Sequence, residues 1–272
     1  MATWNDLSSA LFDRLLAPFG HGPAWFDLVL WPLLAGVMAL VVYKHLSNQK
    51  GIERAKNAIA AHLYKIRLFR HDPLVVIAST GRIFLRNGVY VGHNLVPLAV
   101  LLVPMLAVLA QLEAHYAFDP VPVGSVRLLE LRLDPRAAVL PRDVVLELPA
   151  GVTLDAPPVR TPDGEIFWRL RADAPGDHVL SLRLADETLT KTWAVGGSHR
   201  KVPVKRTKSW EAFLYPGEPA LGRDSAAQTI ALTYPERELA MLPSGELGIL
   251  ATFFGLSLLA GFGLKGRFGV TL

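Results

Sequence analysis

Residues 95–112 read LVPLAVLLVPMLAVLAQL, and this run indicates the class of the protein. Its one interruption is Gln111 near the end, and a helix that crosses about 30 Å of hydrocarbon needs about 20 residues at about 1.5 Å each. Two more apolar runs, Leu28 to Tyr43 and Leu247 to Leu264, have the same character. With their flanking residues, all three runs are long enough. The sequence therefore predicts an α-helical membrane protein with three transmembrane helices.

Composition supports this class. The 272 residues are 51% hydrophobic and only 19% charged, and the mean hydropathy is +0.31. Soluble domains usually have a charged fraction near a quarter, so a cytosolic enzyme or a nucleic-acid-binding chain is disfavoured. There is no cysteine, which excludes disulfides, thiolate metal sites and a cysteine nucleophile.

The charge distribution predicts an orientation. Between Lys44 and Asn87 there are nine basic and two acidic residues, a net charge of +7 in a chain whose total is +4. Cytoplasmic flanks of membrane spans are enriched in Lys and Arg, so this stretch and the tail with Lys265 and Arg267 should be cytoplasmic. We expect a protein of the bacterial inner membrane whose N-terminus and long second connection are periplasmic.

These observations divide the chain into seven expected segments. They are an outer interfacial amphipathic segment (1–24, with Trp4, Leu7, Leu11 and Leu15 at helical spacing), the first span (25–45), a basic cytoplasmic helical hairpin (46–88), the second span (89–112), a periplasmic β-sandwich domain (113–245), the third span (246–264) and a cytoplasmic tail (265–272).

The hairpin is predicted from one apolar stripe and one break. The stripe repeats at steps of three and four and comprises Ile52, Ala55, Ile59, Leu63 and Ile66. Asp72 can cap a second helix with Pro73 at its first position, running from Leu74 towards Asn87. This basic surface either rests near anionic headgroups or docks a nascent chain, a ribosome or a partner subunit. The expected contact residues are Arg54, Lys56, Lys65, Arg67, Arg70, Ile59 and Leu63.

The long connection alternates apolar and polar residues, which is typical of half-buried antiparallel strands. Six runs show the alternation: 126–133, 144–148, 166–171, 179–184, 189–195 and 229–233. Turn residues separate them, so we expect an all-β immunoglobulin-like sandwich outside the membrane, with Trp168 and Trp193 in or near its core. The Pro-Gly-Asp turn before the run at 179–184 resembles that of immunoglobulin-like bacterial outer domains. Trp210 to Tyr215 is expected to form a short helix.

Motifs for chemistry are not found. The eight histidines are scattered, and there is no HExxH, no GxSxG elbow and no phosphate loop. Asp27, His93 and Asn94 are the polar groups nearest the apolar runs, and each is expected to be solvated at a span edge. We therefore expect no enzymatic activity, no cofactor, no metal and no nucleic-acid partner.

The second span, with Pro97 and Pro104 after a basic helical hairpin, resembles the YidC/Oxa insertase superfamily. The similarity is greatest to its reduced three-span members, the archaeal YidC-like proteins and the third subunit of the endoplasmic reticulum membrane complex. It covers residues 25–112 and, more loosely, 246–264. The resemblance implies the orientation given above and a groove, open to cytoplasm and lipid, that helps polar chains enter the bilayer with the aid of a basic group. This chain differs because its spans hold no Lys or Arg and a large β domain separates spans two and three.

Two functions are consistent with these features. The first is a non-enzymatic factor for insertion or assembly of membrane protein complexes, with a ribosome or nascent chain as a partner. The second is a permanent accessory subunit of a respiratory or photosynthetic complex. Small residues on the third span would let another helix approach closely or pack against the chain's own spans: Gly248, Gly255, Gly261, Gly263, Ala251 and Ser257. Both functions require membrane lipids and other integral membrane proteins as partners, at Gly255 and Gly261 in the second case.

Overall fold

The computed structural model describes residues 7, 10, 11, 14, 24–137, 139–185, 187–239 and 241–270. The interfacial segment predicted for residues 1–24 therefore lies almost wholly outside the described residues. The chain forms two compact units. The helical unit contains Val29–Leu106 and the residues from Phe253 onward, and the β unit contains Ala107–Thr252 with the residues up to Leu28.

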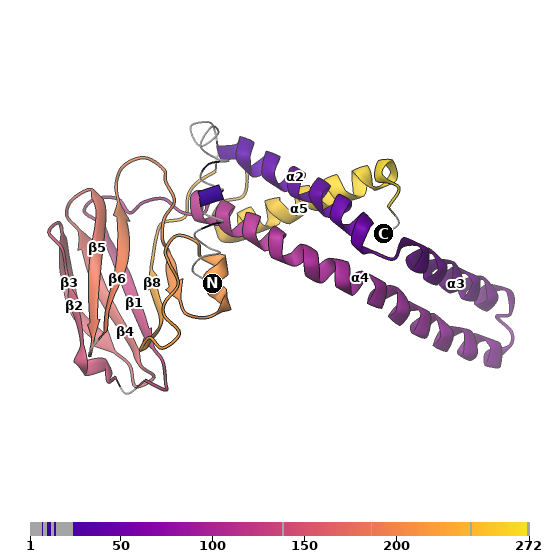
Figure 1. Ribbon diagram of the computed structural model, residues 1–272, viewed down its shortest axis with the longest axis horizontal. Helices are drawn as coiled ribbons and strands as arrows, with labels where there is room; N and C mark the ends of the chain where they lie inside the picture. The colour runs from indigo at the N-terminus through magenta and orange to yellow at the C-terminus, as the bar shows by residue number, and fades with distance from the viewer. Residues whose placement is uncertain are drawn as a thin grey trace. The chain divides into compact units, whose positions relative to one another are not determined.

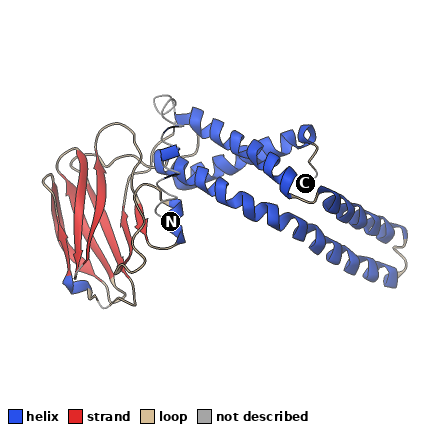
Figure 2. Ribbon diagram, in the orientation of Figure 1, coloured by secondary structure: helices blue, strands red, loops and turns tan. Residues whose placement is uncertain are grey.

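Four helices have described bounds (Figures 1 and 2): α2 (Ala24–Leu46), α3 (Gln49–Leu68), α4 (Pro73–Tyr116) and α5 (Gly245–Phe268). Three of them, α2, α4 and α5, are long and apolar enough to cross a membrane, which confirms the three predicted apolar helices. The second arm of the hairpin and the second span are one helix, because α4 continues for 44 residues, about 66 Å, without a break.

The turn between α3 and α4 follows the predicted signals. The Asp72 carboxylate accepts hydrogen bonds from the backbone N–H groups of Leu74 (3.0 Å) and Val75 (3.2 Å), and Pro73 is the first residue of α4. At the other end of α3, the Asn48 side chain accepts from the N–H of Gly51 at 2.9 Å. Both caps satisfy N–H groups that a helix leaves free at its first turn.

Small residues and one hydroxyl bring α2 and α5 together in the helical unit. A Cβ on Gly36 would lie 3.0 Å from the Cβ of Ala260 and would clash with the Ser257 carbonyl, so only glycine fits there. Ser257 donates from its hydroxyl to the carbonyl of Pro32 at 2.9 Å. Of the small residues predicted on the third span, Ser257 therefore contacts the chain's own first span.

The β unit contains two antiparallel sheets (Figure 2). The five-stranded sheet has the order β3-β4-β1-β8-β7 and the three-stranded sheet the order β2-β5-β6. The strands are β1 (Val126–Leu133), β2 (Val144–Glu147), β3 (Val152–Arg160), β4 (Glu165–Ala172), β5 (Gly176–Leu184), β6 (Glu187–Val195), β7 (Lys205–Thr207) and β8 (Ala227–Leu232), with short 3-10 helices η1 (Pro141–Asp143) and η2 (Trp210–Leu214). Six of these strands and η2 were predicted, whereas β3 and β7 were not.

One hydrophobic core lies between the two sheets. Alternate residues of β1 and β4 from one sheet, and of β5 and β6 from the other, contribute to the same buried cluster. Trp168 and Trp193 are 3% and 0% exposed, which confirms their predicted place in the core. The strand alternation predicted from sequence therefore corresponds to burial in a shared core.

The outer edge of β6 is covered by side chains and one bridging residue instead of another strand. The contacts that cover it are Arg206 Nη1 to Thr190 O (2.6 Å), Thr192 N to Glu218 Oε1 (2.7 Å), Ala194 N to Tyr234 Oη (3.1 Å) and Val121 N to Ala194 O (3.0 Å). Lys191, on the inner face between Leu189 and Trp193, is fully buried; it forms an ion pair with Glu218 and donates to Pro203 O. This network ties the segment from Pro203 to Glu218 onto β6.

Candidate functional site: the α3–α4 hairpin

A compact apolar cluster lies at the base of the hairpin. Leu40 and Tyr43 of α2, Ile52 of α3, Leu101 of α4 and Val270 after α5 are all buried together. The Tyr43 hydroxyl donates to Asn94, whose amide donates to the carbonyl of Tyr90 at 2.6 Å. We call this group the base cluster. It lies beside the C-terminal ends of α2 and α5.

The hairpin continues well beyond the base cluster (Figure 1). Tyr90 packs against that cluster, and Pro73 begins α4 seventeen residues earlier. At 1.5 Å per residue, the start of α4 lies about 26 Å from Tyr90 along the helix. This exceeds the polar headgroup layer, which is about 5–8 Å thick on each side of the hydrocarbon.

Large apolar side chains are exposed along this extension. We call them the tip residues, and they are Leu63 (55% exposed), Tyr64, Leu68 (75%), Phe69, Leu74, Ile77 (69%), Phe84 and Leu85. Basic side chains lie among them, and those at Arg54, Lys56, Lys65, Arg67, Arg70, Arg82 and Arg86 are all exposed. The surface thus combines apolar and positively charged groups, as protein-docking and lipid-docking helices both do.

The predicted stripe on α3 is divided by the structure. Ile52 and Ala55 are buried, Ile59 and Ile66 are half-buried, and Leu63 is exposed. The stripe is therefore buried near the base cluster and only partly buried or exposed from Ile59 onward. The outward apolar residues of α4 were not predicted as contacts, although the sequence between 74 and 91 holds more apolar residues than one packed face uses.

An apolar groove lies between α2, α4 and α5 in the helical unit. Its lining includes Gly36 and Leu40 of α2, Leu101 of α4, and Phe254 and Gly261 of α5, and none of its described lining residues is charged. At Gly261 no described atom beyond the adjacent residues and the local backbone of α5 would lie within 4 Å of an added Cβ, and the same holds at Gly255 on the exposed surface of α5. The predicted contact residues on α5 are thus accessible to another helix.

At the opposite end of α4, the structure contradicts the expectation that Asp27 is solvated. Asp27, expected to be solvated, is 1% exposed in the first turn of α2 and accepts a hydrogen bond from the Tyr116 hydroxyl at the end of α4. The Asp27 Oδ1 atom has no hydrogen-bond partner among the described residues. Arg237 covers the Tyr116 ring with its guanidinium carbon 5.4 Å from the ring centre. Asp27 therefore joins the ends of two apolar helices.

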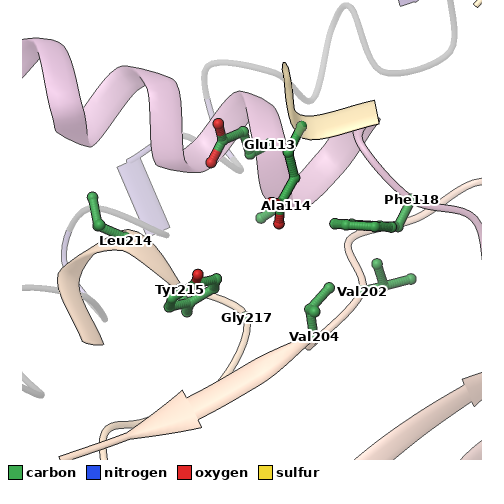
Figure 3. A pocket seen from close by; sticks show the side chains of 9 residues that line it. Glu113, Ala114, Phe118, Val202, Val204, Leu214, Tyr215 and Gly217 are labelled. Carbon is green, nitrogen blue, oxygen red and sulfur yellow. The ribbon is translucent and has the colours of Figure 1, made fainter. Parts of the chain in front are cut away.

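A small hollow opens beside this end of α4 (Figure 3). Glu113 and Ala114 of α4 line one side, and Leu214, Tyr215 and Val204 line the other. Glu246 at the start of α5 also lines it, so two acidic residues belong to a largely apolar lining. In the part of the chain that the structure describes, no group of three or more His, Cys, Asp or Glu residues could hold a metal ion.

Comparison with protein-family models, curated proteins and solved structures finds no match to this chain.

Proposed function

We propose that this chain is a non-enzymatic integral membrane protein that acts in the insertion, assembly or stabilisation of membrane protein complexes. In this proposal it is a reduced three-span member of the YidC/Oxa superfamily, located in the bacterial inner membrane. The hairpin and C-terminus are cytoplasmic, and the β unit is a periplasmic immunoglobulin-like sandwich. The tip residues are the docking surface for a protein partner.

The exposure of the tip residues supports this proposal most directly. Leu68, Phe69 and Leu74 lie near the turn, and Leu74 is about 24 Å along α4 from Tyr90. Even with a helix tilt of about 40°, that separation is about 18 Å along the bilayer normal, beyond the headgroup layer. Lipid would not cover these side chains, and large exposed apolar patches on stable proteins mark interaction sites.

The apolar groove favours assembly over the passage of polar chains. A polar segment in hydrocarbon needs hydrogen-bond partners, and each unsatisfied group costs several kcal/mol. The groove offers the Tyr43 and Ser257 hydroxyls, and Ser257 already donates to Pro32. An apolar helix of another membrane protein matches this lining better than a polar chain does.

Replacing apolar tip residues with acidic ones tests the proposal. Leu68→Asp with Ile77→Asp replaces two exposed apolar side chains, so folding should be unaffected, whereas partner recovery under mild detergent should fall at least tenfold. Thr80→Asp, also exposed and on the same arm, is the matched control and should retain the partners. Equal recovery with the double variant and the control refutes docking through the tip.

A second candidate function, a permanent accessory subunit, is favoured by the open glycines of α5. Gly255→Leu and Gly261→Leu add side chains where an added Cβ would meet no described atom within 4 Å beyond the adjacent residues and the local backbone of α5. In a permanent subunit they should abolish one stoichiometric partner set while leaving the isolated chain folded. In an assembly factor they should leave the tip-dependent partners bound. Native gels of membranes from the two variants distinguish these results.

A further inference from the structure

The two sheets of the β unit meet at two seams, and these seams differ. At one seam, β6 is covered by the contacts of Arg206, Glu218, Tyr234 and Val121 given above. At the other seam, β2 and β3 are the edge strands of their sheets. The link recorded there is the Arg160 Nε–H donating to the carbonyl of Pro141 at 2.8 Å. We call this second seam the open seam.

The backbone of β2 has an unused edge at the open seam. Leu184 and Glu187 flank the two-residue loop between β5 and β6, so they form a hydrogen-bonded pair. Hydrogen-bonded pairs alternate along antiparallel strands, so β5 bonds to β2 through Arg183 and Ser181, opposite Val145 and Glu147. The N–H and C=O of Leu146 therefore point away from β5, and no described group pairs with them.

A groove lies beside this edge, and its chemistry is specific. Its walls are Val144, Leu146 and Leu148 on the β2 side and Leu154 and Pro158 on β3, with the buried Trp168 ring also in its lining. Leu154 is 45% exposed, and β3 opposite is irregular, with register shifts at Leu154/Ala156 and Ala156/Val159. A smooth pairing of β2 with β3 is thus not available to fill the seam.

Two arginines line the same groove. The Nε atom of Arg142 lies 3.7 Å from Oδ1 of Asp143, and the Arg142 side chain is 78% exposed. Arg160 uses Nε for the Pro141 carbonyl and forms no ion pair in the described part of the chain. In contrast, Arg183 on the neighbouring strand pairs with Glu147. The guanidinium of Arg160 is therefore positioned for an acidic group brought in by an occupant.

We infer that the open seam binds an extended segment of a partner protein, which adds as a strand to β2. Its backbone pairs with Leu146, its alternate apolar side chains enter the groove, and an acidic residue at one end pairs with Arg160. Strand addition of this kind derives affinity from main-chain hydrogen bonds and specificity from the pockets for alternate side chains. The inference concerns the β unit and does not depend on the role of the hairpin.

A designed peptide tests the inference on the full chain in lipid nanodiscs. The probe is Glu-(Thr-Val)3-Thr-Glu, which alternates apolar residues and has an acid at each end for either strand direction. Binding should slow hydrogen exchange at the Leu146 amide, while a peptide with Lys at both ends should bind at least tenfold more weakly. Arg160→Glu should weaken binding of the probe at least tenfold, whereas the exposed control Arg223→Glu should stay within twofold.

Results of three kinds would overturn the inference. One is a lack of binding by the wild type, or equal binding by Arg160→Glu and the control. Another is hydrogen exchange at the Leu146 amide that is already slow in the absence of peptide and becomes fast on delipidation. That result would assign the groove to lipid. A third is slow exchange that appears only when two copies share a nanodisc, which would assign it to a second copy. Leu146→Pro, which removes the free N–H, should abolish binding; if it unfolds, the exchange measurement on the wild type still decides.

Discussion

Removal of Glu218 should leave the buried ammonium of Lys191 without a counter-ion. This should destabilise the β unit far more than removal of both Lys191 and Glu218. Lys191 is 0% exposed and Glu218 is 10% exposed, so Glu218→Ala leaves a charge without its counter-ion in the core. Breaking one side of a buried ion pair costs about 3–5 kcal/mol. Lys191→Met breaks the same pair from the other side, but the remaining Glu218 carboxylate is 10% exposed and still accepts from the Thr192 N–H, so this variant should lose less stability than Glu218→Ala.

The double variant Lys191→Met with Glu218→Ala separates the two effects. It should recover most of the loss seen in Glu218→Ala and retain a deficit of about 1–3 kcal/mol, because the Thr192 N–H still loses its acceptor. Pulse proteolysis of the full chain in nanodiscs, following cleavage within the β unit, measures the free energy of unfolding. If Glu218→Ala and the double variant are equally unstable, the loss of stability does not come from an unpaired Lys191 charge, and the prediction is refuted.

The same pair predicts a pH dependence. Burial lowers the pKa of the Lys191 ammonium from its ordinary value of 10.5, against the opposing attraction of Glu218. Between the lowered pKa and 10.5, the unfolded chain binds a proton that the folded chain does not, so stability rises with pH in that window. The free energy of unfolding of the wild type relative to Lys191→Met should therefore increase as the pH approaches 10.5. A difference that is flat or falls there contradicts the assignment.

Four further predictions follow from the packing and the charge pattern. Trp168→Ala should cost about 3–5 kcal/mol of β-unit stability by cavity formation, and a loss below about 1 kcal/mol in urea titration would contradict its buried position. Residues 119–244, expressed alone, should be soluble and give a β-type circular dichroism spectrum, since both sheets share one core; a disordered spectrum would show that the helices are required. Gly36→Leu should lower the thermal aggregation temperature of the detergent-solubilised chain, because its side chain would clash with α5; an unchanged temperature would show that α2 and α5 are not closely packed there. Single cysteines at Thr80 and Arg223 should be inaccessible and accessible, respectively, to an impermeant reagent added outside intact cells, and the reverse pattern would invert the orientation.

The helices were predictable because their signals are local. Asp72 and Pro73 mark the start of α4 through cap chemistry, and the apolar runs exceed the length of ordinary core helices. The continuity of α4 was less evident, since the chain between Leu74 and Leu95 mixes apolar residues with glycines, polar residues and two arginines, which neither breaks a helix nor defines a span. Its Pro97 and Pro104 are tolerated within the helix.

The strands show where sequence reasoning stops. Alternation located β1 and β4, whereas β3 contains Pro157 and Pro158, which disfavour a strand unless it lies at an edge, as β3 does. Lys191 shares the period-two face of Leu189 and Trp193, so the sequence held a signal that this lysine points inward. Its partner Glu218 lies 27 residues later in a segment without regular pattern, and the contact between Asp27 and Tyr116 spans 89 residues. Only the tertiary structure brings such pairs together.

The position of β8 has a consequence for the order in which the chain can mature. β1 lies between β4 and β8 in the five-stranded sheet, yet β8 is synthesised almost a hundred residues after β1. Pairings between such distant segments form late, since the intervening chain must first be made and ordered. Only twelve residues separate Leu232 of β8 from Gly245 of α5. The sheet is therefore completed at nearly the same moment as the last apolar helix is synthesised. The β unit then has almost no time to fold before that helix must be positioned.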